Sequence, residues 1–213
     1  MGRLMPDSGK MLRYGVFGGT FDPPHLGHLI LSAEAGYQLA LDKVLWVLTP
    51  DPPHKQGHKI TPAGIREEMV KAAIGSEPLF EFSRVDIDRP PPTYAVDSVR
   101  IVKAQNPGVQ VVYLIGGDSL HDLPTWYEPE VFVDVCDEIG VMCRPGDRVN
   151  LDDLLLRLPK LEEKIRFVDA PLLEISSSEI RERARLGAPI KFYLPEFVYK
   201  VIQKYELYGL NSE

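Results

Sequence analysis

The sequence predicts an α/β protein in which a doubly wound, mostly parallel sheet carries helices on both faces. Two observations support this fold class. Short apolar runs alternate with longer segments whose apolar residues recur at helical spacing. The loops that follow the apolar runs are rich in Gly, Pro and His. Because parallel sheets bind ligands at the carboxyl ends of their strands, we expect these loops to form the functional site.

The apolar runs define the expected strands, which are residues 12–17, 43–48, 80–87, 109–116, 138–143 and 164–168. The segments with helical spacing define the expected helices, which are residues 27–40, 62–75, 94–105, 150–158 and 194–206. Another helix is expected to begin near Ile175. We predict a single domain over residues 11–213, with a small C-terminal helical portion, after a flexible leader of residues 1–10.

Composition argues against several classes of protein. The formal net charge of −7 argues against nucleic-acid binding, which depends on clusters of Lys and Arg. No apolar run approaches the roughly 18 residues of a membrane span, and no secretory signal precedes the first strand, so we expect a cytoplasmic protein without a membrane partner. Cys136 and Cys143 are interpreted as reduced thiols on or near a buried strand. A homo-oligomer is compatible with the sequence, which does not reveal the oligomeric state.

The loop after the first expected strand reads GGTFDPPHLGH over residues 18–28. Paired glycines let a backbone approach a ligand closely, and the N-terminus of the following helix favours an anion. His25 and His28 are three residues apart at that helix start, so both imidazoles can face one side. The loop therefore predicts a phosphate site whose histidines stabilise charge on a phosphoryl group. The alternatives are a capping histidine or half of a metal site.

Later loops supply further candidates. Lys55, after the second strand, could meet a phosphate, although His54 and His58 beside it could instead be a metal pair. Thr93 is expected to be the N-cap of the helix that follows the third strand. Trp126 offers a flat face for stacking a ring, or is simply part of the core.

Two more loops carry polar groups suited to a nucleotide. Gly116, Gly117 and Asp118 end the fourth strand, where a ribose could lie against the backbone and a carboxylate could accept its hydroxyls. Residues 176–181 read SSSEIR, in which Ser176 and Glu179 fit a capping box and Arg181 lies in the second turn. This segment is either a plain helix cap or a second anion site.

The run at 18–28 resembles the signature of the nucleotidyltransferases that use a His-x-Gly-His element, and it is most similar to the bacterial nicotinate-nucleotide adenylyltransferases. The segments PPHK at 52–55, TYAVDS at 93–98 and ISSSEIR at 175–181 are similar to further motifs of that family, with Ser98 in place of its Thr. The resemblance extends from Leu12 to about Leu207. It implies a Rossmann-like fold of the nucleotidyltransferase type.

The resemblance also implies an activity and assigns residues to it. The expected reaction joins ATP and nicotinate mononucleotide into nicotinate adenine dinucleotide with release of pyrophosphate, and Mg²⁺ is carried by the ATP phosphates rather than by a dedicated protein site. The implied catalytic residues are His25, His28 and Arg181. The implied ATP-binding residues are Gly18, Gly19, Thr20, Phe21, His28, Gly116, Asp118, Ser176, Ser177, Ser178 and Arg181. The implied mononucleotide-binding residues are Lys55, Thr93, Trp126, Tyr127 and Arg144.

Two other functions stay open at this point. A related enzyme could transfer the nucleotide to another phosphate acceptor, such as phosphopantetheine. A module of this fold could also sense ATP or a dinucleotide without turnover.

Overall fold

The protein is described by a computed structural model, which covers residues 11–51, 60–143, 151–171 and 173–210. Its centre is a parallel sheet whose strands lie in the order β3-β2-β1-β4-β5-β6. The strands are β1 (Arg13–Gly19), β2 (Lys43–Leu48), β3 (Phe80–Ser83), β4 (Gln110–Gly116), β5 (Glu138–Cys143) and β6 (Ile165–Asp169). The strand order reverses between β1 and β4, which is the point where open α/β sheets bind ligands. The predicted fold class is confirmed.

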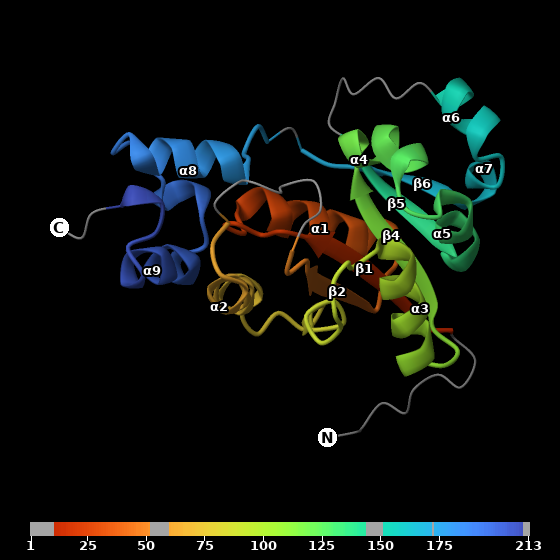
Figure 1. Cartoon of the computed structure of the whole chain (residues 1–213), viewed down its shortest axis with the longest axis horizontal. Helices are drawn as coiled ribbons and strands as arrows, with labels where there is room; N and C mark the ends of the chain where they lie inside the picture. Colours follow the sequence, from red (N-terminus) through yellow and green to blue (C-terminus); the bar gives the residue numbers. More distant parts are fainter. Residues whose placement is uncertain (1–10, 52–59, 144–150, 172, 211–213) are drawn as a thin grey trace.

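Helices cover the sheet on both faces (Figure 1). The α-helices are α1 (Leu26–Gln38), α2 (Ala63–Ile74), α3 (Ala95–Gln105), α4 (Gly117–Asp122), α5 (Pro129–Val135), α6 (Leu151–Arg157), α7 (Leu161–Lys164), α8 (Ser177–Arg185) and α9 (Glu196–Lys204). Short 3₁₀ turns lie at η2 (Leu123–Thr125), η3 (Lys191–Tyr193) and η4 (Leu207–Gly209). Among the residues that the structure describes, no helix has the length and apolar character needed to span a membrane.

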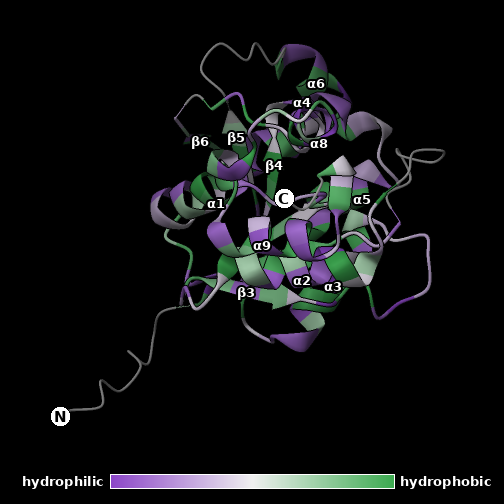
Figure 2. Cartoon of the chain, turned by 90° about the vertical axis from the view of Figure 1, so that its left-hand side faces the viewer, coloured by the Kyte–Doolittle hydropathy of each residue, from purple (hydrophilic) through white to green (hydrophobic). Residues whose placement is uncertain are grey.

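Alternation along the strands explains why both faces need cover. Val111 and Tyr113 of β4 belong to a core cluster with α3, α5 and α7, whereas Val112 and Leu114 belong to a second cluster with α1 and α2. Side chains of a strand point alternately to the two faces of its sheet, so each strand contributes to both clusters. Green and purple residues share the ribbons of α2, α3 and α9 in Figure 2, as expected of helices with one buried side.

The C-terminal helices form a third core of their own. Ile180 of α8 and Val198 and Ile202 of α9 cluster with Met69, which α2 contributes. Figure 1 shows α8 and α9 at one end of the molecule, away from α5, α6 and α7. This arrangement brings the start of α8 towards the loop after β1.

Two expected elements differ from the structure. The run at 80–87 was expected to be one strand, but β3 ends at Ser83, because its partner β2 ends at Leu48 and the last pair is Val47 with Ser83. The chain then turns, and Val85 joins the opposite core cluster. Residues 117–125 were expected to be a loop, but they form α4 and η2. Leu120 and Leu123, three residues apart, are both fully buried there, which explains the helical turn.

Candidate active site

One cavity lies at the point where the strand order reverses. Its volume is about 760 Å³, and the loops after β1 and β4 both line it. We call it the switch-point cavity. The predicted site residues that line it are Gly18, Gly19, Thr20, Thr93, Gly116, Trp126 and Tyr127. The structure therefore brings together residues predicted for both substrates.

The aromatic end of this cavity combines flat rings with one hydroxyl. Trp126 lines the cavity and also packs edge-on against Tyr113, so it belongs to the core as well as to the site. Tyr127 stacks on Tyr94 with ring centroids 4.0 Å apart. Thr93 is 7% exposed, and its Oγ1 has no hydrogen-bond partner. A buried hydroxyl without a partner is costly, so it marks a place where a ligand can bind.

Thr93 is not the cap that the sequence predicted. Helix α3 begins at Ala95 with Tyr94 in the N-cap position, and no side chain caps it. Arg89, five residues before Tyr94, donates to the carbonyl oxygen of Tyr94 at 2.9 Å at this helix start. Thr93 lies one residue before the cap, on the cavity side.

The paired glycines, which were expected in the loop after the first strand, are instead the last two residues of β1, and the protein's own rings require them there. A Cβ at Gly18 would lie 2.8 Å from the phenol oxygen of Tyr113, and a Cβ at Gly19 would lie 2.8 Å from the ring of Phe21. The backbone at Gly18 and Gly19 therefore runs directly against aromatic side chains as well as along the cavity. Larger residues at either position would displace those rings.

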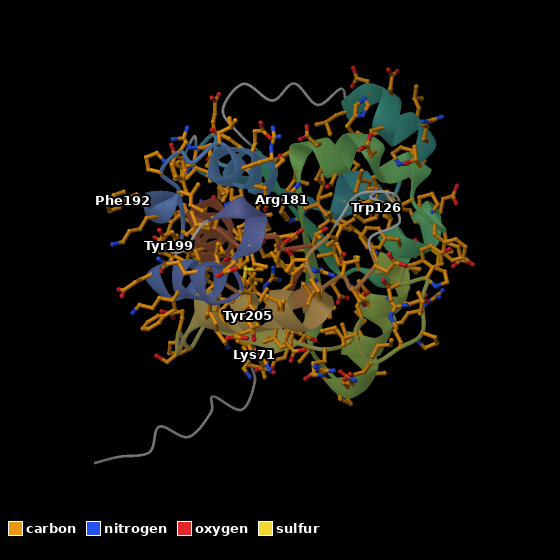
Figure 3. All side chains as sticks on the ribbon, turned by 60° about the vertical axis from the view of Figure 1, so that its left-hand side comes forward. Lys71, Trp126, Arg181, Phe192, Tyr199 and Tyr205 are labelled. Atoms are coloured by element: carbon orange, nitrogen blue, oxygen red, sulfur yellow. The ribbon has the colours of Figure 1, made fainter. Side chains whose placement is uncertain are left out.

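The second cavity, of about 380 Å³, lies where the starts of α1 and α8 face each other. We call it the histidine cavity. The predicted site residues that line it are His25, His28, Ser176, Ser177, Ser178 and Arg181. Figure 3 shows Arg181, on this cavity, well apart from Trp126, on the switch-point cavity. One segment, Phe17 to His28, lines both cavities.

The two histidines meet as their spacing predicts. His25 is the N-cap of α1, and the ring centroids of His25 and His28 are 3.7 Å apart. Nδ1 of His28 accepts a hydrogen bond from the backbone N–H of His25 at 3.2 Å. A neutral His28 therefore carries its proton on Nε2, which makes Nε2 a donor.

Gly27, between the histidines, leaves room for the ring of His25. A Cβ at Gly27 would lie 3.0 Å from Nδ1 and 3.1 Å from Cε1 of His25. We expect Gly27→Ala to lower kcat about tenfold or more, because a small displacement of a positioned group has large kinetic effects. The fold should survive, since alanine is a better helix former than glycine. Steady-state kinetics and thermal unfolding check this, and a variant with normal kcat would show that the ring of His25 has room to move.

The start of α8 is both a helix cap and a wall of the histidine cavity. Oγ of Ser176 accepts a hydrogen bond from the N–H of Glu179 at 3.1 Å, as predicted for an N-cap. Ser177 donates to the carbonyl oxygen of Pro23 at 2.8 Å, and Arg181 donates to the carbonyl oxygen of Asp22 at 2.7 Å. The helix start therefore holds the loop that leads to His25 in addition to lining the cavity.

Two predicted residues lie away from both cavities. The side chain of Phe21 is 2% exposed, and its ring packs against His28 with centroids 5.2 Å apart, so it supports the histidine from the core. Asp118 is exposed in the first turn of α4, whereas its neighbour Ser119 lines the switch-point cavity. Lys55 and Arg144, together with His54 and His58, lie outside the residues that the structure describes.

The sequence analysis missed Arg66, which is 1% exposed. Its guanidinium donates to the carbonyl oxygens of Thr20, Thr49, Pro50 and Thr61 at 2.6–2.8 Å. Burial lowers the pKa of Arg66, and the charge of Asp22 opposes this shift. A signal was present in the sequence, because Arg66 precedes the buried Met69 and Val70 by three and four residues and thus lies on the apolar side of its helix.

Comparisons with known proteins show which family this chain belongs to. A model of the cytidylyltransferase-like family matches residues 16–183. A probable nicotinate-nucleotide adenylyltransferase of Thermomicrobium roseum is 40% identical over 93% of this chain and 92% of its own. The nicotinate-nucleotide adenylyltransferase of Bacillus subtilis is 38% identical over 93% of this chain and 99% of its own.

Solved structures show the same fold at lower identity. The nicotinic acid mononucleotide adenylyltransferase of Plasmodium falciparum, complexed with NaAD, superposes with a TM-score of 0.77 at 21% identity, covering 95% of this chain and 100% of its own. The two relatives from Thermomicrobium roseum and Bacillus subtilis match almost the whole length of this sequence. Because these relatives and the family model match most of its length, the chain belongs to the nicotinate-nucleotide adenylyltransferase family, within the cytidylyltransferase-like nucleotidyltransferases.

Proposed function

We propose that the protein transfers the adenylyl group of ATP to nicotinate mononucleotide, as an enzyme of NAD biosynthesis in the cytoplasm. The observation that carries this proposal is the histidine pair. His25 and His28 stack at the start of α1 and line one cavity with the serines and Arg181 at the start of α8. Two helix N-termini with imidazole, hydroxyl and guanidinium donors suit a polyphosphate.

In the proposed reaction, a phosphate oxygen of the mononucleotide attacks the α-phosphorus of ATP, and the bond from that phosphorus to the pyrophosphate oxygen breaks. We assign the triphosphate to the histidine cavity and the mononucleotide to the switch-point cavity. His28 would donate from Nε2 to the charge that develops on the phosphoryl oxygens, beside His25. Arg181 would hold the leaving pyrophosphate with the donors at the start of α8. Phosphoryl transfer needs this positioning and electrostatic stabilisation rather than a covalent intermediate.

We propose that Mg²⁺ enters with ATP. The described residues contain no group of three or more His, Cys, Asp or Glu side chains placed to hold a metal ion. The ion would then be bound mainly by phosphate oxygens, where it neutralises part of their charge. This proposal matches the donor set of the histidine cavity, which is cationic and hydroxylic rather than acidic.

We propose that the acid, nicotinate mononucleotide, is preferred over its amide counterpart. Thr93 offers a buried hydroxyl without a partner beside Trp126, and a carboxylate can accept from such a donor. The carbonyl oxygen of an amide could also accept from Thr93, but its NH₂ group would be mispaired with any second donor that faces the ring substituent, and a mispaired buried group costs about 1 to 3 kcal/mol. We therefore expect kcat/KM for the acid to exceed that for the amide by roughly ten- to several-hundred-fold.

The test measures kcat/KM by pyrophosphate release, with ATP and each of three acceptors: nicotinate mononucleotide, its amide, and phosphopantetheine. Thr93→Val, which removes the hydroxyl at nearly constant volume, should narrow the discrimination between acid and amide. Equal values for acid and amide would contradict the ring assignment. Turnover only with phosphopantetheine would favour the rival enzyme, and binding of ATP without any turnover would favour a sensing module.

A further inference from the structure

The loop that delivers the histidines contains a buried carboxylate. Asp22, three residues before His25, is 3% exposed. Its Oδ1 accepts a hydrogen bond from the hydroxyl of Tyr208 at 2.7 Å, and its Oδ2 accepts one from the N–H of Thr61 at 3.2 Å. A buried carboxylate is strongly destabilising unless donors satisfy it, so these two bonds determine where the Asp22 side chain can lie.

The donors come from segments far along the chain. Tyr208 lies in η4, after the last helix, at 186 residues from Asp22, whereas Thr61 lies just before α2. The phenol oxygen of Tyr208 also lies 3.5 Å from Oγ1 of Thr61. Burial is the main cause of the raised pKa of Tyr208, with the charge of Asp22 next, so the phenol stays protonated and donates. The C-terminal turn and the start of α2 therefore meet at one carboxylate.

The backbone of the same loop is held from a third direction. Arg181 donates to the carbonyl oxygen of Asp22 and Ser177 donates to that of Pro23. With its carboxylate fixed by Tyr208 and its carbonyl fixed by Arg181, Asp22 has little freedom to move. The imidazole of His25, which lines the histidine cavity, follows after two prolines.

We propose that Tyr208 is a positioning residue for the adenylyl transfer, acting through Asp22 to hold the His25–His28 segment against the start of α8. The C-terminal turn would then be part of the catalytic machinery without touching substrate. This inference rests on the proposed function. Neither residue belongs to the site predicted from the sequence, and their contact joins opposite ends of the chain.

The test compares two tyrosine-to-phenylalanine changes three residues apart. Tyr208→Phe removes the donor to Asp22 and keeps the ring. Tyr205→Phe is the matched control, because the Tyr205 hydroxyl also donates to a carboxylate, that of Glu68 on α2, at 2.9 Å, but away from both cavities. Figure 3 shows Tyr205 at α2, near Lys71, with Arg181 higher in the view.

We expect Tyr208→Phe to lower kcat roughly ten- to a hundredfold while the KM for each substrate changes less than threefold, because a catalytic group displaced by about 1 Å loses rate at that scale. Tyr205→Phe should keep wild-type kcat. If the hydroxyl of Tyr208 only stabilises the fold, Tyr208→Phe will lower the melting temperature and leave kcat per folded molecule unchanged. That result would overturn the proposal.

A second readout does not depend on turnover, so it separates this proposal from the proposed function. Amide hydrogen exchange in residues 20–28 should become faster in Tyr208→Phe and stay unchanged in Tyr205→Phe. Asp22→Asn should also speed exchange in residues 20–28, because it removes the charge that strengthens the bond from Tyr208, and its NH₂ would either face the N–H of Thr61 or turn the Tyr208 hydroxyl from donor into acceptor. The double variant, Asp22→Asn with Tyr208→Phe, should lose no more kcat than the more damaging of the two single variants, since both changes act on one contact. Unchanged exchange in Tyr208→Phe, or fully additive losses, would show that the contact does not hold the loop, whatever reaction the protein catalyses.

Discussion

Replacement of His28 by alanine should lower kcat by about 10²- to 10³-fold, which is the usual effect of removing one preorganised donor from a transition-state charge. His28 lines the histidine cavity, and its Nδ1 is engaged by the backbone N–H of His25, so Nε2 is the nitrogen that can donate to a phosphoryl oxygen. Substrate KM values should change much less, because the charge in question develops only in the transition state. Steady-state kinetics with ATP and nicotinate mononucleotide measure this effect.

The fold should tolerate this change. His28 is half-buried at the third position of α1, where alanine is favourable for the helix. The matched control is His121→Ala, because His121 is exposed on α4 and lines neither cavity. We expect the control to keep normal turnover. A well-folded His28→Ala variant with turnover like the control would remove His28 from the catalytic role.

Local sequence patterns predicted the fold because they report on local structure. Continuous apolar runs such as residues 43–48 became a strand with unchanged bounds, since a strand in the middle of a parallel sheet is buried on both faces. The pattern failed at residues 84–87, where apolar side chains continue past the end of β3. Val85 is buried through a turn rather than through the sheet, and hydropathy alone does not separate these two cases.

For the candidate site too, relations within one motif were predictable from the sequence, and relations between motifs were not. Residues within one motif, such as His25 and His28 or Ser176 and Glu179, were placed together correctly, because three-residue spacing at a helix start fixes their relation. The division of the site into two cavities was not predictable, since it depends on how α8 packs against α1. The roles of Gly18 to Thr20 and of Asp118 in ATP binding stay predictions.

Contacts between segments that are distant along the chain could not be predicted, because they produce no periodic pattern in the sequence. The hydroxyl of Tyr208 reaches Asp22 only because α9 packs on α2 through the third core cluster, which includes Met69. The hydrogen bonds of Arg66 to Thr20 and Thr49 likewise form because β1 and β2 end side by side. Such residues are recognisable in a structure as buried polar groups with several partners.

Replacement of Arg66 by methionine should lower the free energy of unfolding by at least about 3 kcal/mol. Methionine keeps the unbranched shape but has no donor, so four carbonyl oxygens lose their partner, those of Thr20, Thr49, Pro50 and Thr61. A buried acceptor left without a partner costs about 1 to 3 kcal/mol, and water entering the gap can satisfy some of the four. Urea unfolding with an unchanged m-value measures the loss.

Two controls separate this effect from the loss of a charge. Arg66→Lys keeps a cation and up to three donors, but it lacks the planar fork that serves carbonyls in several directions, so it should recover only part of the stability. Arg185→Met removes an exposed arginine that pairs with Glu182 on the surface of α8, and exposed pairs contribute little, so its unfolding should match that of the wild type. Because the carbonyl oxygens of Thr20 and Thr49 directly follow the ends of β1 and β2, Arg66→Met should also loosen the end of β1 that borders the switch-point cavity and reduce turnover in the folded fraction. Equal stability of Arg66→Met and Arg185→Met would mean that the four carbonyl oxygens find other donors, and that the loops at the edge of the switch-point cavity are held by their own packing.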